Sequence, residues 1–441
     1  MNSVDMDAFA PVLDELDLSS FEVTGEIPFD LNGTLVRNGP NPLSGHFESE
    51  DVLSWWPEAA MLHGITLTGG KATGYRNRWV RTQNWANHKG DGESNQYQET
   101  NPNVNVISHG GEILALAEGG QPLVINQSLE TLGATVIHPA LQRGVTAHPK
   151  IDPGTGELMY FKADWQAPWL RYGVLDAAGR ETLDVEIEVP APSMMHDMAI
   201  TETHSILLDL SVGFDFSMFE LGFRIPICWQ DNRQSRLCVL PRHGGEIHWI
   251  EIEPCFIQHV VNAYNDADGT IVLDVVRYPT YFTRNAKGDG FLPNPLGVLW
   301  RYRIDLGKGT AAESQMDDLC IELPRINESF TGKNNRYLYA LEQPADNMMR
   351  GVVRYDLLTG SRDCHKVDEG DQNSEPVFIP RENSVDEDDG WVLVCVYLKT
   401  TNTSELRILD ARDLSSSPVA TIKLGRRIPA GFHGAWLNDE R

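Results

Sequence analysis

Four histidines in this sequence have a residue type and a spacing that could build a metal centre. His148, His196, His259 and His433 each stand at a strand-like segment, and the four segments come from distant parts of the chain. Neutral imidazoles bind divalent transition metals, and four of them leave coordination positions open for small ligands. Because no local metal motif of the HExxH kind is present, the sequence predicts a site that the fold must assemble from separate elements.

Three glutamates could orient these histidines. Glu118, Glu322 and Glu375 stand in otherwise apolar segments, where a carboxylate is costly unless it is paired. A metal-bound imidazole needs its second ring N–H held by a carboxylate or a carbonyl, and a buried glutamate could accept that bond. For any one glutamate, a position at a strand end facing solvent is the commoner arrangement.

The segments that must position these residues are typical of short β-strands. Apolar runs such as SILLDL and WVLVCVYL recur along the chain, and helical periodicity is hard to find. Turn sequences rich in Asp and Gly, at residues 152–154, 266–269 and 388–390, lie between such runs and predict hairpins. We therefore expect an all-β fold, a β-propeller or large barrel, with residues 1–441 in one domain. A propeller would bring distant histidines together, because the inner strand of each blade faces a common axis.

Charge and composition exclude several classes of function. The formal net charge is −27, from 36 basic and 63 acidic residues, which disfavours binding to nucleic acid and to anionic lipid. No segment approaches the roughly 20 apolar residues needed to span a bilayer, and the acidic N-terminus does not resemble a secretory signal, so we expect a cytoplasmic protein. Any peripheral membrane contact would be apolar, for example through residues 214–229, and the six scattered cysteines are expected to be reduced.

Nearly the whole chain resembles the carotenoid cleavage oxygenases. The resemblance rests on LNGTLVRNGPNP, ALAEGG, AHPKIDPGTGEL, MMHDMAIT, NAYNDADGTIVLDVVRY, the EPVF segment and the closing GFHGAW. This family includes carotenoid and apocarotenoid dioxygenases, lignostilbene and isoeugenol oxygenases, and the vertebrate retinoid isomerohydrolase. The resemblance implies a seven-bladed β-propeller capped by loops, with Fe(II) on its axis bound by His148, His196, His259 and His433. Glu118, Glu322 and Glu375 match the glutamates that hold the second, third and fourth of these histidines.

The activity implied by the resemblance is that of a non-haem Fe(II) dioxygenase. Such an enzyme cleaves a C=C bond of a hydrophobic polyene or aryl alkene with O2 and gives two carbonyl products. An apolar tunnel would select the polyene, because a polyene has few polar groups. The candidates for its lining are Trp79, Phe214, Phe216, Phe219 and Phe223.

Departures from the family pattern bear on the substrate. The lignostilbene and isoeugenol members have a lysine directly before the first glutamate, where it can hold a phenol, and here that position is Ala117. Asn103-Val104 replaces a common Asn-Thr pair beside the open metal site, and WWPEAAMLHG replaces an acidic, glycine-rich loop. A carotenoid or apocarotenoid is therefore the expected substrate. The alternatives are a stilbene or phenylpropene cleavage oxygenase, an isomerohydrolase, and a propeller that only binds. Imidazole ligands also suit zinc and copper.

Overall fold

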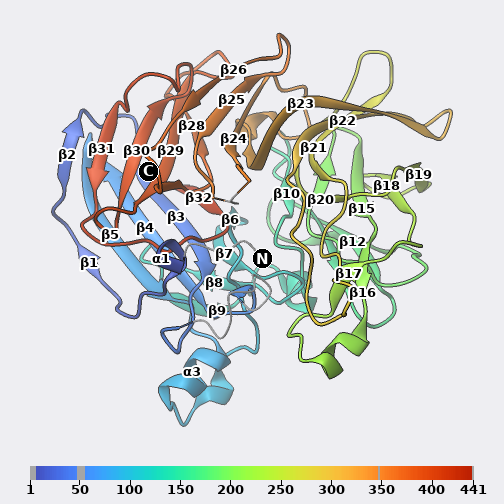
Figure 1. Ribbon diagram of the computed structural model, residues 1–441, viewed down its shortest axis with the longest axis horizontal. Coiled ribbons are helices and arrows are strands. Elements are labelled where there is room, and N and C mark those ends of the chain that lie inside the picture. The colour runs from blue at the N-terminus through green and yellow to red at the C-terminus, as the bar shows by residue number, and fades with distance from the viewer. Residues whose placement is uncertain (1–5, 47–54, 346–347, 440–441) are drawn as a thin grey trace.

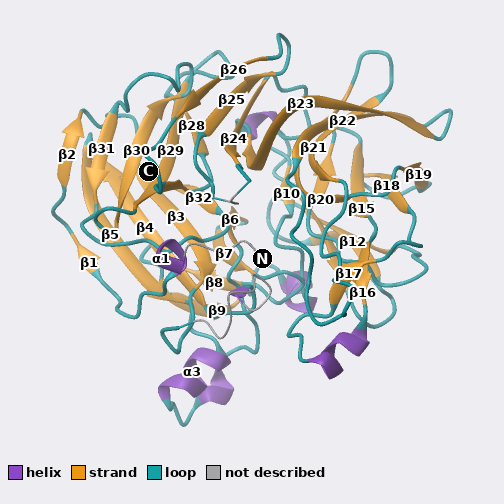
Figure 2. Ribbon diagram, in the orientation of Figure 1, coloured by secondary structure: helices purple, strands orange, loops and turns teal. Residues whose placement is uncertain are grey.

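The computed structural model describes residues 6–46, 55–345 and 348–439, and antiparallel β-sheets dominate it (Figure 2). The sheets follow one another around a central axis in the order of the chain, so that the blue N-terminal strands lie beside the red C-terminal strands (Figure 1). The expected all-β, seven-bladed propeller is confirmed. The inner strands of neighbouring blades contact each other: β10 contacts β14, and β14 contacts β20.

The first four blades in the described part of the chain are separate sheets. Blade 1 contains β32 (Gly434–Asn438), β3 (Gly33–Pro40), β4 (Ala60–Thr68), β5 (Lys71–Trp79) and β1 (Asp17–Leu18). Blade 2 contains β6 (Asn105–His109), β7 (Glu112–Leu116), β8 (Leu123–Ile125) and β9 (Thr131–Ala134). Blade 3 contains β10 (Lys150–Ile151), β11 (Leu158–Ala163), β12 (Leu170–Leu175) and β13 (Glu181–Glu186). Blade 4 contains β14 (Met198–Ile200), β15 (His204–Asp209), β18 (Ser235–Pro241) and β19 (His248–Ile252).

Blades 5 and 6 share one long strand, β23 (Thr310–Arg325), which pairs with β22 between residues 310 and 320 and with β24 between residues 321 and 325. Blade 5 contains β20 (Phe256–Asn265), β21 (Ile271–Tyr278) and β22 (Val298–Asp305). Blade 6 contains β24 (Tyr337–Glu342), β25 (Val352–Asp356) and β26 (Ser361–His365). Blade 7 contains β27 (Gln372–Asn373), β28 (Val377–Pro380), β29 (Gly390–Leu398), β30 (Thr403–Asp410), β31 (Ala420–Lys423) and β2 (Glu22–Gly25).

Strands from both ends of the chain close the ring. β2 pairs with β31 from Glu22 opposite Lys423, and β32 pairs with β3 from Gly33 opposite Asn438. Two neighbouring blades therefore each combine an N-terminal with a C-terminal segment. Full closure of this kind leaves few free strand edges around the axis.

Hydrophobic clusters fill the spaces between blades. One cluster joins Tyr172 of β12 to Leu207 of β15, and another joins Leu35 of β3 to Leu406 of β30. Burial of one such leucine contributes about 1.5–3 kcal/mol, so each blade is stabilised mainly by its two neighbours. The three turn sequences rich in Asp and Gly connect paired strands, as predicted.

Helices are short and lie outside the sheets. Those that lie wholly within the described ranges are α1 (Met6–Phe9), α3 (Gln83–Lys89) and the 3-10 turns η1 (Ser94–Gln96), η2 (Pro139–Arg143), η3 (Phe216–Leu221) and η4 (Glu328–Phe330). α3 begins after Thr82, whose side chain accepts the N–H of Trp85, and it ends at Gly90 with φ 72°. η3 lies in an insertion between β15 and β18, where it forms part of the connection between the paired strands β16 (Val212–Phe214) and β17 (Ile227–Trp229). Over the described residues, no helix has the length and apolar character needed to cross a membrane.

Candidate metal centre

The structure brings the four candidate histidines to one point. His148 and His196 each precede the first residue of an inner strand by two positions, β10 and β14 respectively. His259 lies within β20, and His433 directly precedes β32. One ring nitrogen from each of the four lies within 4.8 Å of the others, and the Nε2 atoms of His148 and His196 are 3.0 Å apart. The inner strands supply this convergence, because all of them run toward the same axis.

Three of the four imidazoles contact a glutamate through Nδ1. The Nδ1–carboxylate distances are 2.6 Å for His196 and Glu118, 2.6 Å for His259 and Glu322, and 2.9 Å for His433 and Glu375. In the first pair the groups are within hydrogen-bonding distance but lie off the preferred N–H···O direction. A glutamate that accepts the Nδ1 proton leaves the Nε2 lone pair free for a metal.

The chemistry of the donor atoms fits a transition metal. The Nε2 atom of His259 is buried and has no hydrogen-bond partner among the described residues. A buried polar atom without a partner is costly, and a metal ion at this point would satisfy it. Four imidazole nitrogens with no thiolate in the cluster suit iron, zinc or copper.

Further side chains that the sequence did not single out hold the glutamates in place. Tyr278 donates its hydroxyl to Oε1 of Glu322 at 2.6 Å, and the N–H of Leu323 donates to the other oxygen. Glu375 accepts from Nη1 of Arg325 at 3.0 Å and from the N–H of Gly434 at 2.8 Å. Arg325 lies three residues after Glu322, so the segment ELPRIN contains one of the three glutamates and holds another, Glu375. Only the folded chain reveals this second contact.

Burial and neighbouring charges set the protonation of the cluster. Burial lowers the pKa of His148 well below its usual value, and the three neighbouring imidazoles add to the effect. Burial also lowers the pKa of His433 to about 4, although Glu375 opposes the shift. Burial opposes ionisation of His259 as well, but Glu322 outweighs it and raises the pKa of that imidazole. The imidazoles of His148 and His433 are therefore neutral near pH 7 and can act as metal ligands. The Glu322 carboxylate favours a positive charge on or beside the imidazole of His259.

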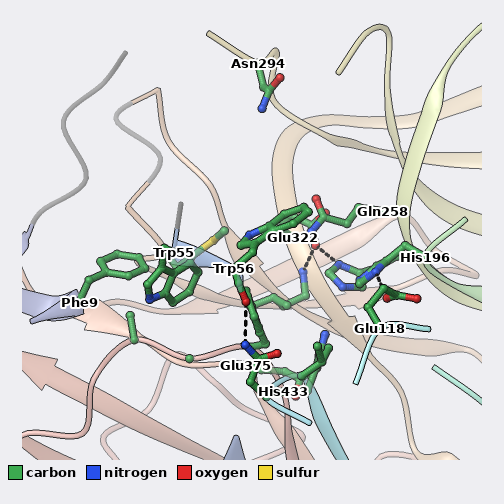
Figure 3. A pocket seen from close by; sticks show the side chains of 18 of the residues that line it. Phe9, Trp55, Trp56, Glu118, His196, Gln258, Asn294, Glu322, Glu375 and His433 are labelled. Atoms are coloured by element: carbon green, nitrogen blue, oxygen red, sulfur yellow. Dashed lines mark hydrogen bonds and ion pairs between the residues drawn. The ribbon is translucent and has the colours of Figure 1, made fainter. Parts of the chain in front are cut away.

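A cavity of about 830 Å³ opens over the cluster and is lined by His196, His259 and His433 together with the three glutamates. Three segments contribute many of its lining side chains, at residues 55–57, 214–227 and 281–296. In the view of Figure 3, Phe9, Trp55 and Trp56 lie on one side of the cavity and His196 with Glu118 on the other. Phe282 packs edge-on against Trp56, with ring centroids 5.5 Å apart, and has a left-handed backbone at φ 51°. A strained residue of this kind is common at binding sites.

The structure corrects the predicted cavity lining. Phe214 lines the cavity, but Trp79 is 3% exposed and packs in a hydrophobic cluster with Ala59 and Met61. Phe216 and Phe219 are 44% and 45% exposed on η3, because this turn projects from the cap. Phe223 packs against the ring of Phe291, with centroids 5.3 Å apart, and is not a lining residue.

Of the positions that depart from the family pattern, Asn103, Val104, Ala117 and residues 55–57 line the cavity, whereas residues 58–64 do not. Ala117 and Val104 contribute small apolar surfaces beside the cluster. Asn103 donates from Nδ2 to the carbonyls of Trp56 and Glu58, each at 2.7 Å, and so holds one cap loop. The six cysteines are free thiols, as expected.

The fold and the cluster define a class of protein, and comparison with known proteins agrees. Residues 9–438 match the model of the family described as retinal pigment epithelial membrane protein, RPE65. The chain belongs to this family, whose matched members include carotenoid cleavage oxygenases, and it carries a four-histidine cluster suited to a metal ion.

Individual relatives match over nearly the full length. A carotenoid cleavage oxygenase from Mycobacterium tuberculosis is 33% identical, covering 97% of this chain and 96% of its own. A carotenoid 9,10(9',10')-cleavage dioxygenase from Arabidopsis thaliana is 30% identical, covering 98% and 89%. A variant of the Synechocystis apocarotenoid oxygenase superposes with a TM-score of 0.88 at 26% identity, covering 98% of each chain. The lignostilbene dioxygenase of Pseudomonas brassicacearum superposes with a TM-score of 0.87 at 26% identity, covering 99% of each.

Proposed function

We propose that this protein is an iron(II)-dependent dioxygenase that cleaves a C=C bond of a carotenoid or apocarotenoid. One observation carries the proposal: three imidazoles of the four-histidine cluster line a large, mostly apolar cavity that contains many aromatic side chains. His148, His196, His259 and His433 would hold the metal, and Glu118, Glu322 and Glu375 would orient three of them. Both atoms of O2 enter the products, one at each carbon of the broken bond.

The bound iron(II) would supply a site at which O2 is activated, since four neutral ligands leave it dicationic with open positions. The protein would position the substrate beside the metal and exclude water from the cavity. Trp55, Trp56, Phe282 and Phe432 present ring faces and edges that suit a conjugated polyene and exclude water. The length of the cavity beyond the histidines would select the double bond that reacts.

The competing substrate class is a phenolic stilbene or phenylpropene, and a lignostilbene dioxygenase is among the structural relatives. Ala117 argues against it, because this residue lines the cavity beside Glu118 with a methyl group that cannot hold a phenol. A panel of β-carotene, apocarotenals, resveratrol and isoeugenol, analysed by product mass, distinguishes the two classes. We expect paired carbonyl products from the carotenoid compounds, and cleavage of the phenolic compounds alone would overturn the assignment.

The metal is tested separately. Protein is purified without added metal and then loaded with iron(II) under anaerobic conditions. It should contain close to one iron per chain, and only this iron form should cleave the substrate. Zinc-loaded protein provides the control, since Zn²⁺ suits the same ligands but has no redox chemistry. Cleavage by iron-free protein would contradict the proposal.

We also propose that an aromatic patch beside the cavity mouth contacts a lipid surface, from which a carotenoid could enter. The patch consists of Trp165, Phe214, Phe216, Phe219 and Leu221. Trp165 is 51% exposed, and its ring centroid lies 5.8–6.3 Å from those of the three phenylalanines. Trp165 and Phe214 also line the cavity, so the patch is continuous with its wall.

The double variant Phe216→Ser/Phe219→Ser tests this contact. We expect it to lose most of its sedimentation with neutral phosphatidylcholine vesicles, while its thermal melting stays close to that of the wild type. Phe29→Ser is the matched control, because Phe29 is 78% exposed and lies between β2 and β3, outside the patch. Equal sedimentation of all three proteins would exclude the patch as the contact.

A further inference from the structure

A fourth carboxylate, Asp197, lies among the strands that carry the candidate ligands. It follows His196 directly and is 1% exposed. Oδ1 contacts Nζ of Lys150 at 2.7 Å and accepts the N–H of Met198 at 2.7 Å. Oδ2 accepts the N–H of Val260 at 2.8 Å. One buried carboxylate therefore joins three inner strands, β10, β14 and β20.

A candidate metal ligand lies within each of these strands or two residues before it, close to the point of contact. Lys150 stands two residues after His148, Asp197 directly follows His196, and Val260 directly follows His259. The pairing of β20 with β21 is irregular here, since its register shifts on both sides of Val260. A backbone N–H in such a bulge needs another acceptor, and Asp197 provides it.

His148 differs from the other three histidines in its surroundings. In the described part of the chain, no carboxylate contacts either of its ring nitrogens, whereas each of the others has its own glutamate. The ion pair of Lys150 with Asp197 links the strand of His148 to the rest of the cluster.

We propose that Asp197 is a positioning residue of the metal centre, which fixes the relative placement of His148, His196 and His259 through their strands. The proposal rests on the four-histidine metal site of the proposed function and does not depend on the substrate. Because all three partners of Asp197 are donors, both of its oxygens must be acceptors. Asp197→Asn replaces one oxygen with an NH2 group. This group would face one of the present N–H donors, and the repulsion between two donors would push one strand away.

The test uses Co(II) in place of iron, because its visible absorption reports ligand geometry without any turnover. Wild type and Asp197→Asn are titrated with Co(II), and their affinities are measured by competition with a chelator. We expect Asp197→Asn to bind Co(II) at least about tenfold more weakly, with a shifted absorption band, as is typical when the support of a ligand is lost.

Asp356→Asn is the matched control. Asp356 is also buried, pairs with Arg336 at 2.6 Å and accepts a backbone N–H, that of Leu358. It lies on β25, the third strand of blade 6 counted from the axis, away from the cluster. We expect it to lower the melting temperature but to keep its Co(II) affinity within about twofold of the wild type, since distant sites behave independently.

The outcomes separate this proposal from the one on which it rests. Wild-type affinity and an unshifted band in Asp197→Asn would overturn the role of Asp197 and leave the metal centre intact. A wild-type protein that bound no Co(II) would overturn both. If Asp197→Asn does not fold, Lys150→Met decides the question, because it keeps both backbone bonds of Asp197 and detaches only β10. We then expect a shifted Co(II) band, and an unchanged spectrum would exclude the proposal.

Discussion

The contact between each glutamate and its histidine decides which ring nitrogen faces the centre of the cluster. Removal of an imidazole and removal of its glutamate should therefore have different consequences. His196→Ala deletes a ligand, so we expect no detectable cleavage and a sharp loss of bound iron. Glu118→Ala keeps the His196 ligand but no longer fixes the orientation of its ring. We therefore expect iron affinity to fall about 10–100-fold, with residual activity. Iron content and turnover, measured on the same samples, check both variants, and wild-type rates in both would refute the assignment.

A different histidine, outside the cluster, gives the protein a pH dependence. His63 on β4 is buried and contacts the hydroxyl of Tyr75 at 2.9 Å. Burial, with added repulsion from Arg37 and Arg427, lowers its pKa to about 3. The unfolded chain binds a proton near pH 6.5 and the folded chain does not, so its contribution to stability is complete above pH 6.5 and is lost as the pH falls toward 3.

His63→Asn removes this titration. Between pH 6.5 and 5 we expect the wild type to lose roughly 2 kcal/mol more unfolding free energy than the variant, at about 1.4 kcal/mol per pH unit. Denaturant unfolding at the two pH values measures the difference. Parallel pH profiles for the two proteins would mean that His63 is not the group responsible.

At the scale of elements, the cap is held to the propeller by a few polar contacts. Asn103 binds two carbonyls of the loop that carries Trp56, so Asn103→Ala leaves both without that donor. Loss of these bonds costs about 1–3 kcal/mol and should loosen the cavity wall. We expect a raised KM and a lower melting temperature with an unchanged iron content. Thr182 offers a comparison away from the cavity, because its hydroxyl donates to the carbonyl of Val174 within blade 3. Thr182→Val removes a polar contact of similar kind and should leave KM unchanged.

The elements also show which features of the structure could be predicted from the sequence. The hairpins and the histidine-bearing strands were predictable, because Asp-Gly turns and β-branched runs act locally. The aromatic lining was not, since Trp79 and Trp56 are both tryptophans near β4 and only the fold places one in the core and the other at the cavity. The support given by Tyr278, Arg325 and Asp197 likewise depends on contacts between distant strands. No local pattern predicts that β23 serves two blades.

At the scale of the whole molecule, we propose that residues 1–441 form one cooperative domain. Each blade is stabilised by its neighbours, and strands from both ends of the chain close the ring. We expect a single calorimetric transition, raised by bound iron and lowered when a chelator removes it, because a ligand that binds only the folded state stabilises it. Two separate transitions would show that the blades unfold in groups.

The ring closure has a consequence for biosynthesis. His433 and β32 are made after every other blade has been translated, so a nascent chain still being extended lacks its fourth imidazole and the strand that seats it. A complete four-histidine centre therefore assembles only after residue 433 has been synthesised, and a chain truncated before that residue would lack both the fourth imidazole and β32.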